Sequence, residues 1–158
     1  MAEKIYIHYG SNKFDPKLIF SPHNPGDLYI KNKPVNALWA SDVEADLGWK
    51  DWCTREEFYT DRLDKSFRFK LKDDAKVLYI DSLEKEELIP IREGSYWTGI
   101  CAVERPYDFD KLVEMGIDAV EVSISSCHDL YNQIYGWDCD SIAILNPDVI
   151  EVIDNEEL

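Results

Sequence analysis

Two carboxylates, Asp138 and Asp140, flank a cysteine just before an apolar run that stops at Asn146-Pro147. An apolar run of this length between turn residues predicts a buried strand ending at Leu145. Acids at the mouth of a buried strand are costly to desolvate, so they are usually paired, hydrogen-bonded or functional. Alternation along a strand puts both acids on one face. Two neighbouring carboxylates also shift each other's pKa apart, which leaves one of them able to act as a base.

We expect the opposite wall of such a site to come from the N-terminal stretch Ile7-His8-Tyr9-Gly10-Ser11. The segment Leu38-Trp39-Ala40-Ser41 adds a third group of candidates. Each of these residues also has a purely structural interpretation, because most buried aromatic side chains serve packing and acids at strand ends are commonly solvated. The functional interpretation therefore depends on all three groups meeting in space.

Other chemistries have less support. The chain has no serine-hydrolase elbow, P-loop or dinucleotide-binding glycine fingerprint. A cysteine nucleophile would require Cys127-His128 or Cys139, but a buried free cysteine is commonly a small hydrophobic residue. His8, His23 and the acids lack metal-ligand spacing, so no metal site is predicted.

The composition predicts one acidic globular domain. The chain has 158 residues with 17 basic and 32 acidic side chains, a formal charge of −15. Such a field repels phosphates at long range, so non-specific nucleic-acid binding is not expected. The four cysteines form no Cys-x-x-Cys pair, and neither a signal peptide nor a membrane-spanning run is evident. We therefore predict a cytoplasmic protein with reduced thiols.

The periodicity predicts an α+β fold in which strands outnumber helices. The predicted strands cover residues 4–9, 35–41, 66–72, 75–80, 117–124, the run ending at 145, and 149–153. The predicted helices cover residues 44–59, or a shorter segment after Gly48, then 84–88 and 107–115. Residues 66–72 and 75–80 are expected to form a hairpin. Three stretches stay open: 17–20 as a helical turn or strand, 92–103 as a loop or lid, and 126–135 as a short helix or ordered loop. We assign residues 1–153 to a single domain and 154–158 to an acidic tail.

These motifs, in this order, resemble those of the ADP-ribosyltransferase superfamily, in particular its poly(ADP-ribose) polymerase and diphtheria-toxin branch. That branch carries a His, a Tyr and a Glu on three strands. The matching features are a strand with His-x-Gly-Ser, a Leu-Trp-Ala-Ser strand followed by a helix, and a late strand that opens with an acid. The helix-Gly-strand segment at residues 112–120 also matches. The stretch Lys33 to Ser41 is similar to one in phage and bacterial proteins.

The resemblance implies split antiparallel or mixed sheets with a few short helices, and NAD as substrate. It implies that His8 bonds the adenosine ribose, and that Gly10 and Ser11, with Tyr9 beside them, approach the nicotinamide amide. It further implies that Trp39 stacks on the nicotinamide ring with Ser41 nearby. Asp140 takes the place of the catalytic glutamate, and Asp138 that of the acid two residues before it.

The implied reaction is mono-ADP-ribosylation of an unidentified acceptor, which is a protein, nucleic acid or small molecule, by a phage or bacterial effector or toxin. A carboxylate near the ribose would stabilise the positive charge that develops as nicotinamide leaves. The chain departs from the family by having Asp for Glu and Trp for Tyr. Glu121, on the preceding strand, is a spare acid. The alternative is a non-catalytic module on the same fold whose acidic surface docks a basic partner.

Overall fold

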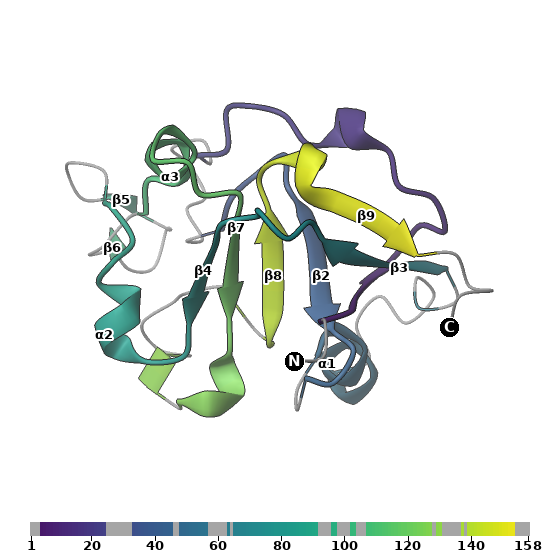
Figure 1. Cartoon of the computed structure of the whole chain (residues 1–158). Helices are drawn as coiled ribbons and strands as arrows, with labels where there is room; N and C mark the ends of the chain where they lie inside the picture. The colour runs from purple at the N-terminus through teal and green to yellow at the C-terminus, as the bar shows by residue number, and fades with distance from the viewer. Residues whose placement is uncertain are drawn as a thin grey trace.

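The computed structural model describes residues 4–24, 33–45, 48–56, 63, 65–91, 96–97, 102–103, 107–127, 129–130, 137 and 139–153. Within these residues the chain is a mixed α+β protein built on a seven-stranded mixed sheet with a few short helices (Figure 1). The coarse fold class expected from periodicity is therefore confirmed. None of the helices in this part of the chain is long and apolar enough to span a membrane.

The strand order in the main sheet is β4-β7-β8-β2-β1-β3-β9. The strands are β1 (Tyr6–Tyr9), β2 (Leu38–Asp42), β3 (Ser66–Leu71), β4 (Val77–Ile80), β7 (Ala119–Val122), β8 (Ser141–Ile144) and β9 (Ile150–Ile153). Neighbouring strands are antiparallel except β4 and β7, which are parallel. Each lies within a segment predicted from alternation or from an apolar run, apart from the last residue of β2.

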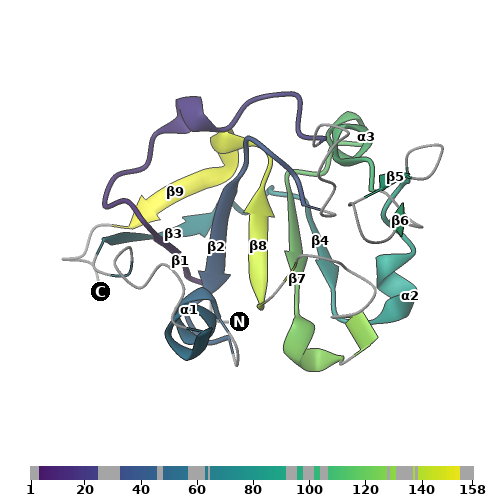
Figure 2. The same cartoon turned by 180° about the vertical axis from the view of Figure 1, so that it is seen from behind.

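The sheet has two parts that share β2. Strands β4, β7, β8 and β2 run roughly side by side, whereas β3 and β9 run across that direction (Figure 1). Strand β2 changes partner along its length: Leu38, Trp39 and Ala40 pair with β8, and Ser41 and Asp42 pair with β1. The view from behind shows β1 beside β2, with α1 below them (Figure 2). A strand that changes partner in this way lets the two parts of a twisted sheet diverge.

The core covers both faces of the central strands. On β8, Ala143 belongs to one buried cluster, together with Trp137 and Leu112, while Ile142 and Ile144 belong to the other. All four residues of β8 are buried, as are all four of β7. A strand buried on both faces appears in the sequence as a continuous apolar run rather than an alternating one. This explains why β8 is recognisable without periodicity.

The helices begin and end at identifiable signals. Helix α1 (Trp49–Glu56) starts directly after Gly48, α2 (Leu83–Glu86) is capped by Ser82, and α3 (Phe109–Glu114) is capped by Asp108. In both capped helices the cap oxygen accepts a bond from the backbone N–H three residues on. Among the described residues, short 3-10 helices cover Pro16–Leu18, Ile124–Ser126 and Pro147–Val149. The stretch 17–20, left open above, thus begins as a helical turn.

The predicted hairpin between residues 66–72 and 75–80 is wrong. Strand β3 pairs with β1 and β9, and β4 pairs with β7. The turn between β3 and β4 therefore carries the chain from one part of the sheet to the other. Within the stretch 92–103, β5 (Tyr96–Trp97) and β6 (Ala102–Val103) form an antiparallel ribbon. The other residues of that stretch, most of 126–135 and the tail 154–158 lie outside the described residues.

Candidate functional site

The two parts of the sheet separate where β1 and β2 stop pairing. Tyr6 and Ile7 of β1 face Asp42 and Ser41 of β2, and the ladder ends there. Beyond this point β1 stays with β3, and β2 turns to β8. We call this point of separation the fork. At the fork the backbone of Trp39 has no partner on β1, and the His8 side chain bonds it instead.

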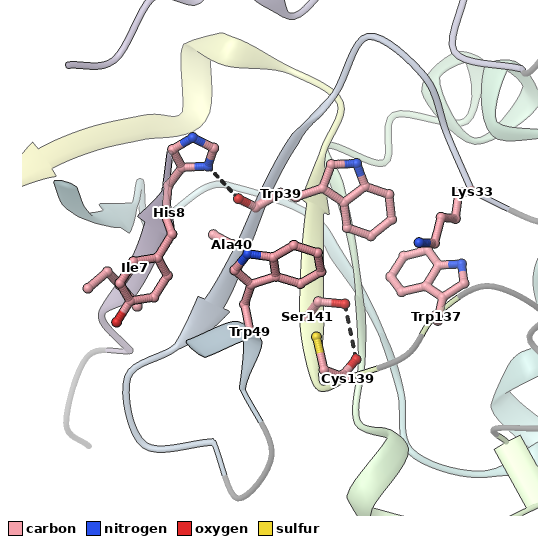
Figure 3. Close-up of a pocket in the computed structure, with 10 residues that line it drawn as sticks. Ile7, His8, Lys33, Trp39, Ala40, Trp49, Trp137, Cys139 and Ser141 are labelled. Carbon is pink, nitrogen blue, oxygen red and sulfur yellow. Dashed lines mark hydrogen bonds between the residues drawn. The ribbon is translucent and has the colours of Figure 1, made fainter. Parts of the chain in front are cut away.

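His8 is oriented by a short hydrogen bond to this backbone. Its Nδ1 lies 2.6 Å from the carbonyl oxygen of Trp39 (Figure 3). Because a carbonyl only accepts, Nδ1 must carry the proton and donate it. Burial lowers the pKa of His8, against a smaller opposite effect of the Trp39 bond. The imidazole is therefore neutral near pH 7, with Nε2 as its acceptor nitrogen.

An aromatic cavity of about 250 Å³ opens at the fork. Trp39 from β2, Trp49 from the start of α1 and Trp137 from the segment before β8 contribute three indole rings, which gather in the middle of the site (Figure 3). Among the residues that the structure describes, the lining consists of Ile7, His8, Tyr9, Lys33, Trp39, Ala40, Trp49, Trp137, Cys139 and Ser141. None of these residues carries a carboxylate. The cavity is thus suited to a flat, largely apolar ring.

The indole rings are held by different contacts. Trp137 is 2% exposed and meets Trp39 edge-on, with ring centroids 4.8 Å apart. Trp49 stacks on Trp52 at 5.5 Å along α1. Trp39 and Trp49 are only partly buried, so their faces remain accessible from the cavity. The packing fixes the cavity walls without filling the space between them.

Ser41, on β2, positions the start of α1 and the beginning of β8 and does not line the cavity. It is 2% exposed, and its hydroxyl donates to the Asp140 carbonyl oxygen at 2.8 Å and accepts from the Trp49 backbone N–H at 2.8 Å. It therefore connects the end of β2, the start of α1 and the beginning of β8. Nothing in this arrangement brings the hydroxyl to a ligand in the cavity.

Asp140 directs its carboxylate away from the aromatic cavity. One oxygen accepts the Ser125 backbone N–H at 2.8 Å and the other accepts the Ser125 hydroxyl at 2.6 Å. The carboxylate lines a second, polar hollow of about 260 Å³. His8 and Asp140 therefore do not line one cavity, contrary to the expectation that an imidazole and this carboxylate would face each other.

The second hollow also contains Glu121, the spare acid on β7. Tyr6 donates to Glu121 Oε1 at 2.7 Å, and the Lys4 ammonium lies 3.4 Å from the same oxygen. Burial raises the pKa of Glu121, and the Tyr6 and Lys4 contacts partly offset this. Burial and the neighbouring Glu121 raise the pKa of Tyr6. Among the described residues no group of His, Cys, Asp and Glu is arranged to hold a metal ion.

The remaining predicted residues divide between the cavity and the surface. Tyr9 lines the cavity, and burial raises the pKa of its hydroxyl. Gly10 is exposed, with a φ of 109° that suits glycine, and its N–H bonds the Lys65 carbonyl oxygen. The Ser11 hydroxyl bonds the Lys13 backbone instead of the site. Asp138 lies outside the described residues.

Sequence reasoning missed several cavity residues. The sequence patterns assign no role in the site to Trp49, Trp137 or Lys33. The two tryptophans share one unusual feature, a position at the start of an element: Trp49 opens α1, and Trp137 precedes β8. No protein-family model, curated protein or solved structure was found to match this chain.

Proposed function

We propose that this protein binds NAD in the aromatic cavity and transfers ADP-ribose to an acceptor, with release of nicotinamide. The observation that carries the proposal is the fork between β1 and β2, where His8 and Trp39 meet at one cavity. The resemblance to the ADP-ribosyltransferases assigns NAD-binding roles to these same two residues. A split sheet is also what that resemblance implies.

The proposed chemistry breaks the bond between the nicotinamide nitrogen and ribose C1′. Nicotinamide leaves with the bonding electron pair as a neutral molecule, the acceptor attacks C1′, and the acceptor's proton passes to a base. The indole rings hold the departing ring, and the acceptor nitrogen of His8 takes a hydrogen bond from a ribose hydroxyl. The resemblance assigns the stabilisation of the positive charge on the sugar to Asp138 or Asp140, and because the Asp140 carboxylate is bonded to Ser125, Asp138 is the acid that we propose for this role.

Nicotinamide release from NAD tests this proposal. The wild-type protein should release nicotinamide slowly even without an acceptor, with water taking the acceptor's place. His8→Ala and Trp39→Ala should lower the rate by at least about tenfold, since each removes a positioning contact. Ser126→Ala, a change at an exposed residue outside the aromatic cavity, is the matched control. A wild-type protein that shows no thermal shift with NAD and no nicotinamide release contradicts the proposal.

The placement of Asp140 favours a second candidate, a non-catalytic binding module. Its carboxylate is bonded to Ser125 in the other hollow, and no described cavity-lining residue is acidic. In this case the chain would bind a nucleotide or a basic partner without turnover. Asp138→Asn and Asp140→Asn separate the two candidates. Loss of nicotinamide release with NAD binding retained supports the enzyme, whereas NAD binding without release in the wild type supports the module.

A further inference from the structure

A single cation stands among the described residues that line the aromatic cavity. Lys33 is the only Lys or Arg in that set, in a chain whose formal charge is −15. Its ammonium lies 5.6 Å from the ring centroid of Trp39, within the range of a cation–π contact. A field this negative disfavours anionic ligands at long range, whereas a lysine ammonium attracts an anionic group that it contacts directly.

The fold fixes the backbone around Lys33. The next residue, Pro34, is buried, and Val35 donates its N–H to the His23 carbonyl oxygen at 2.8 Å. His23 in turn bonds the Val35 carbonyl oxygen through Nδ1 at 3.0 Å. The segment before β2 is therefore tied to a buried histidine. The Lys33 side chain therefore starts from a defined position, and its ammonium ends 5.6 Å from the ring centroid of Trp39.

In Figure 3 the rings of Trp39 and Trp49 lie between His8 and Lys33, and Trp137 lies beside Lys33. A cavity of about 250 Å³ is smaller than the 300–1,000 Å³ of pockets for drug-sized ligands, so it encloses one substituted ring rather than a whole dinucleotide. If the sugar lies at the His8 side, the ring substituent points toward Lys33. Gly10, the residue that the resemblance assigns to that substituent, is exposed and does not line the cavity.

We propose that Lys33 is the specificity-determining residue of the cavity. Its ammonium donates to an oxygen of the ring's acyl substituent, so the site binds a ring bearing a carboxylate more tightly than the same ring bearing a carboxamide. The inference rests on the proposed function, which places a pyridine ring among the tryptophans. It extends the substrate class to pyridine nucleotides with an acid group on the ring.

Nicotinate and nicotinamide are the matched probes, because they have the same ring and differ in the charge of one group. Titration of the full chain, followed by NMR of the tryptophan indole N–H signals, gives both affinities and reports which indoles respond. We expect nicotinate to bind about tenfold more tightly, the effect of one hydrogen bond to a charged group. Lys33→Gln should bring the ratio of affinities to about one, and Lys33→Arg should keep it.

Lys72→Gln provides the control, since Lys72 is exposed and lines neither hollow. It makes the same change in net charge and should leave the ratio unchanged. Added salt should weaken nicotinate and leave nicotinamide unaffected, a test that needs no variant. The inference is overturned by equal wild-type affinities, by a ratio that survives Lys33→Gln, or by rings that shift no indole signal. NAD binding and nicotinamide release measured alongside show whether the proposed function survives such a result.

Discussion

Replacing Ser41 by alanine should destabilise the fold and loosen the cavity together. The Ser41 hydroxyl makes two hydrogen bonds of 2.8 Å inside the protein, to the Asp140 carbonyl and from the Trp49 N–H. A neutral hydrogen bond contributes about 1 kcal/mol net. The two bonds together predict a loss of about 2 kcal/mol in the free energy of unfolding. For a domain of this size the melting temperature should fall by about 4–8 °C.

Urea denaturation followed by tryptophan fluorescence measures this change. The midpoint should fall while the denaturant slope stays constant, because the exposed surface on unfolding is the same. Ser126→Ala removes a hydroxyl whose bond to Ser123 is exposed, and should change stability by no more than about 0.5 kcal/mol. The altered start of α1 should also weaken ring binding among the tryptophans. A Ser41→Ala protein as stable as the control would refute the positioning role of this hydroxyl.

Three further perturbations test other contacts. Tyr6→Phe removes a donor from buried Glu121, so unfolding should need about 1.5–3 kcal/mol less free energy, and the pKa of Glu121 should rise further, as NMR titration can measure. His8→Gln should reduce the decrease in the free energy of unfolding that occurs as the pH falls. The lowered pKa of folded His8 means that the unfolded chain binds more protons, so stability falls as pH drops below about 6.5; denaturation at several pH values checks the slope. Gly116→Ala should lower the free energy of unfolding by about 1–2 kcal/mol, because Gly116 follows α3 with a φ of 87°. Thermal unfolding should show a lower melting temperature for Gly116→Ala and a smaller decrease for Gly116→Asn, since asparagine tolerates positive φ. An unchanged melting temperature in Gly116→Ala would contradict the strain argument.

Local sequence patterns predicted where the strands lie better than they predicted which strands pair. Alternation located β3, and an uncharged apolar run located β8, because both patterns follow directly from which strand faces are buried. The choice of partner was not predictable in the same way. Strands β3 and β4 are adjacent in sequence and joined by a short turn, yet their apolar faces are buried in different parts of the sheet. Which strands pair therefore depends on where these apolar faces are buried among segments distant in the sequence, and not on the turn that joins the two strands.

Part of the candidate site was likewise predictable from the sequence, and part was not. His8 and Trp39 were expected together, and the partner change of β2 brings them together. The direction of the Asp140 carboxylate was not predictable, because its partner Ser125 lies in a 3-10 turn that no periodicity identifies. Lys33 was overlooked for a similar reason. A lysine in the segment before a strand becomes informative only once three indoles line the same cavity.

The place of β8 between β7 and β2 also affects how the chain is made. A ribosome releases β1, β2, β3, β4 and β7 before β8 emerges, so the middle of the sheet is completed late in synthesis. Until then β7 and β2 each present an unpaired edge, a template for joining another chain. A nascent polypeptide halted before Ser141 should therefore recruit holding chaperones, and release them once β8 closes the gap.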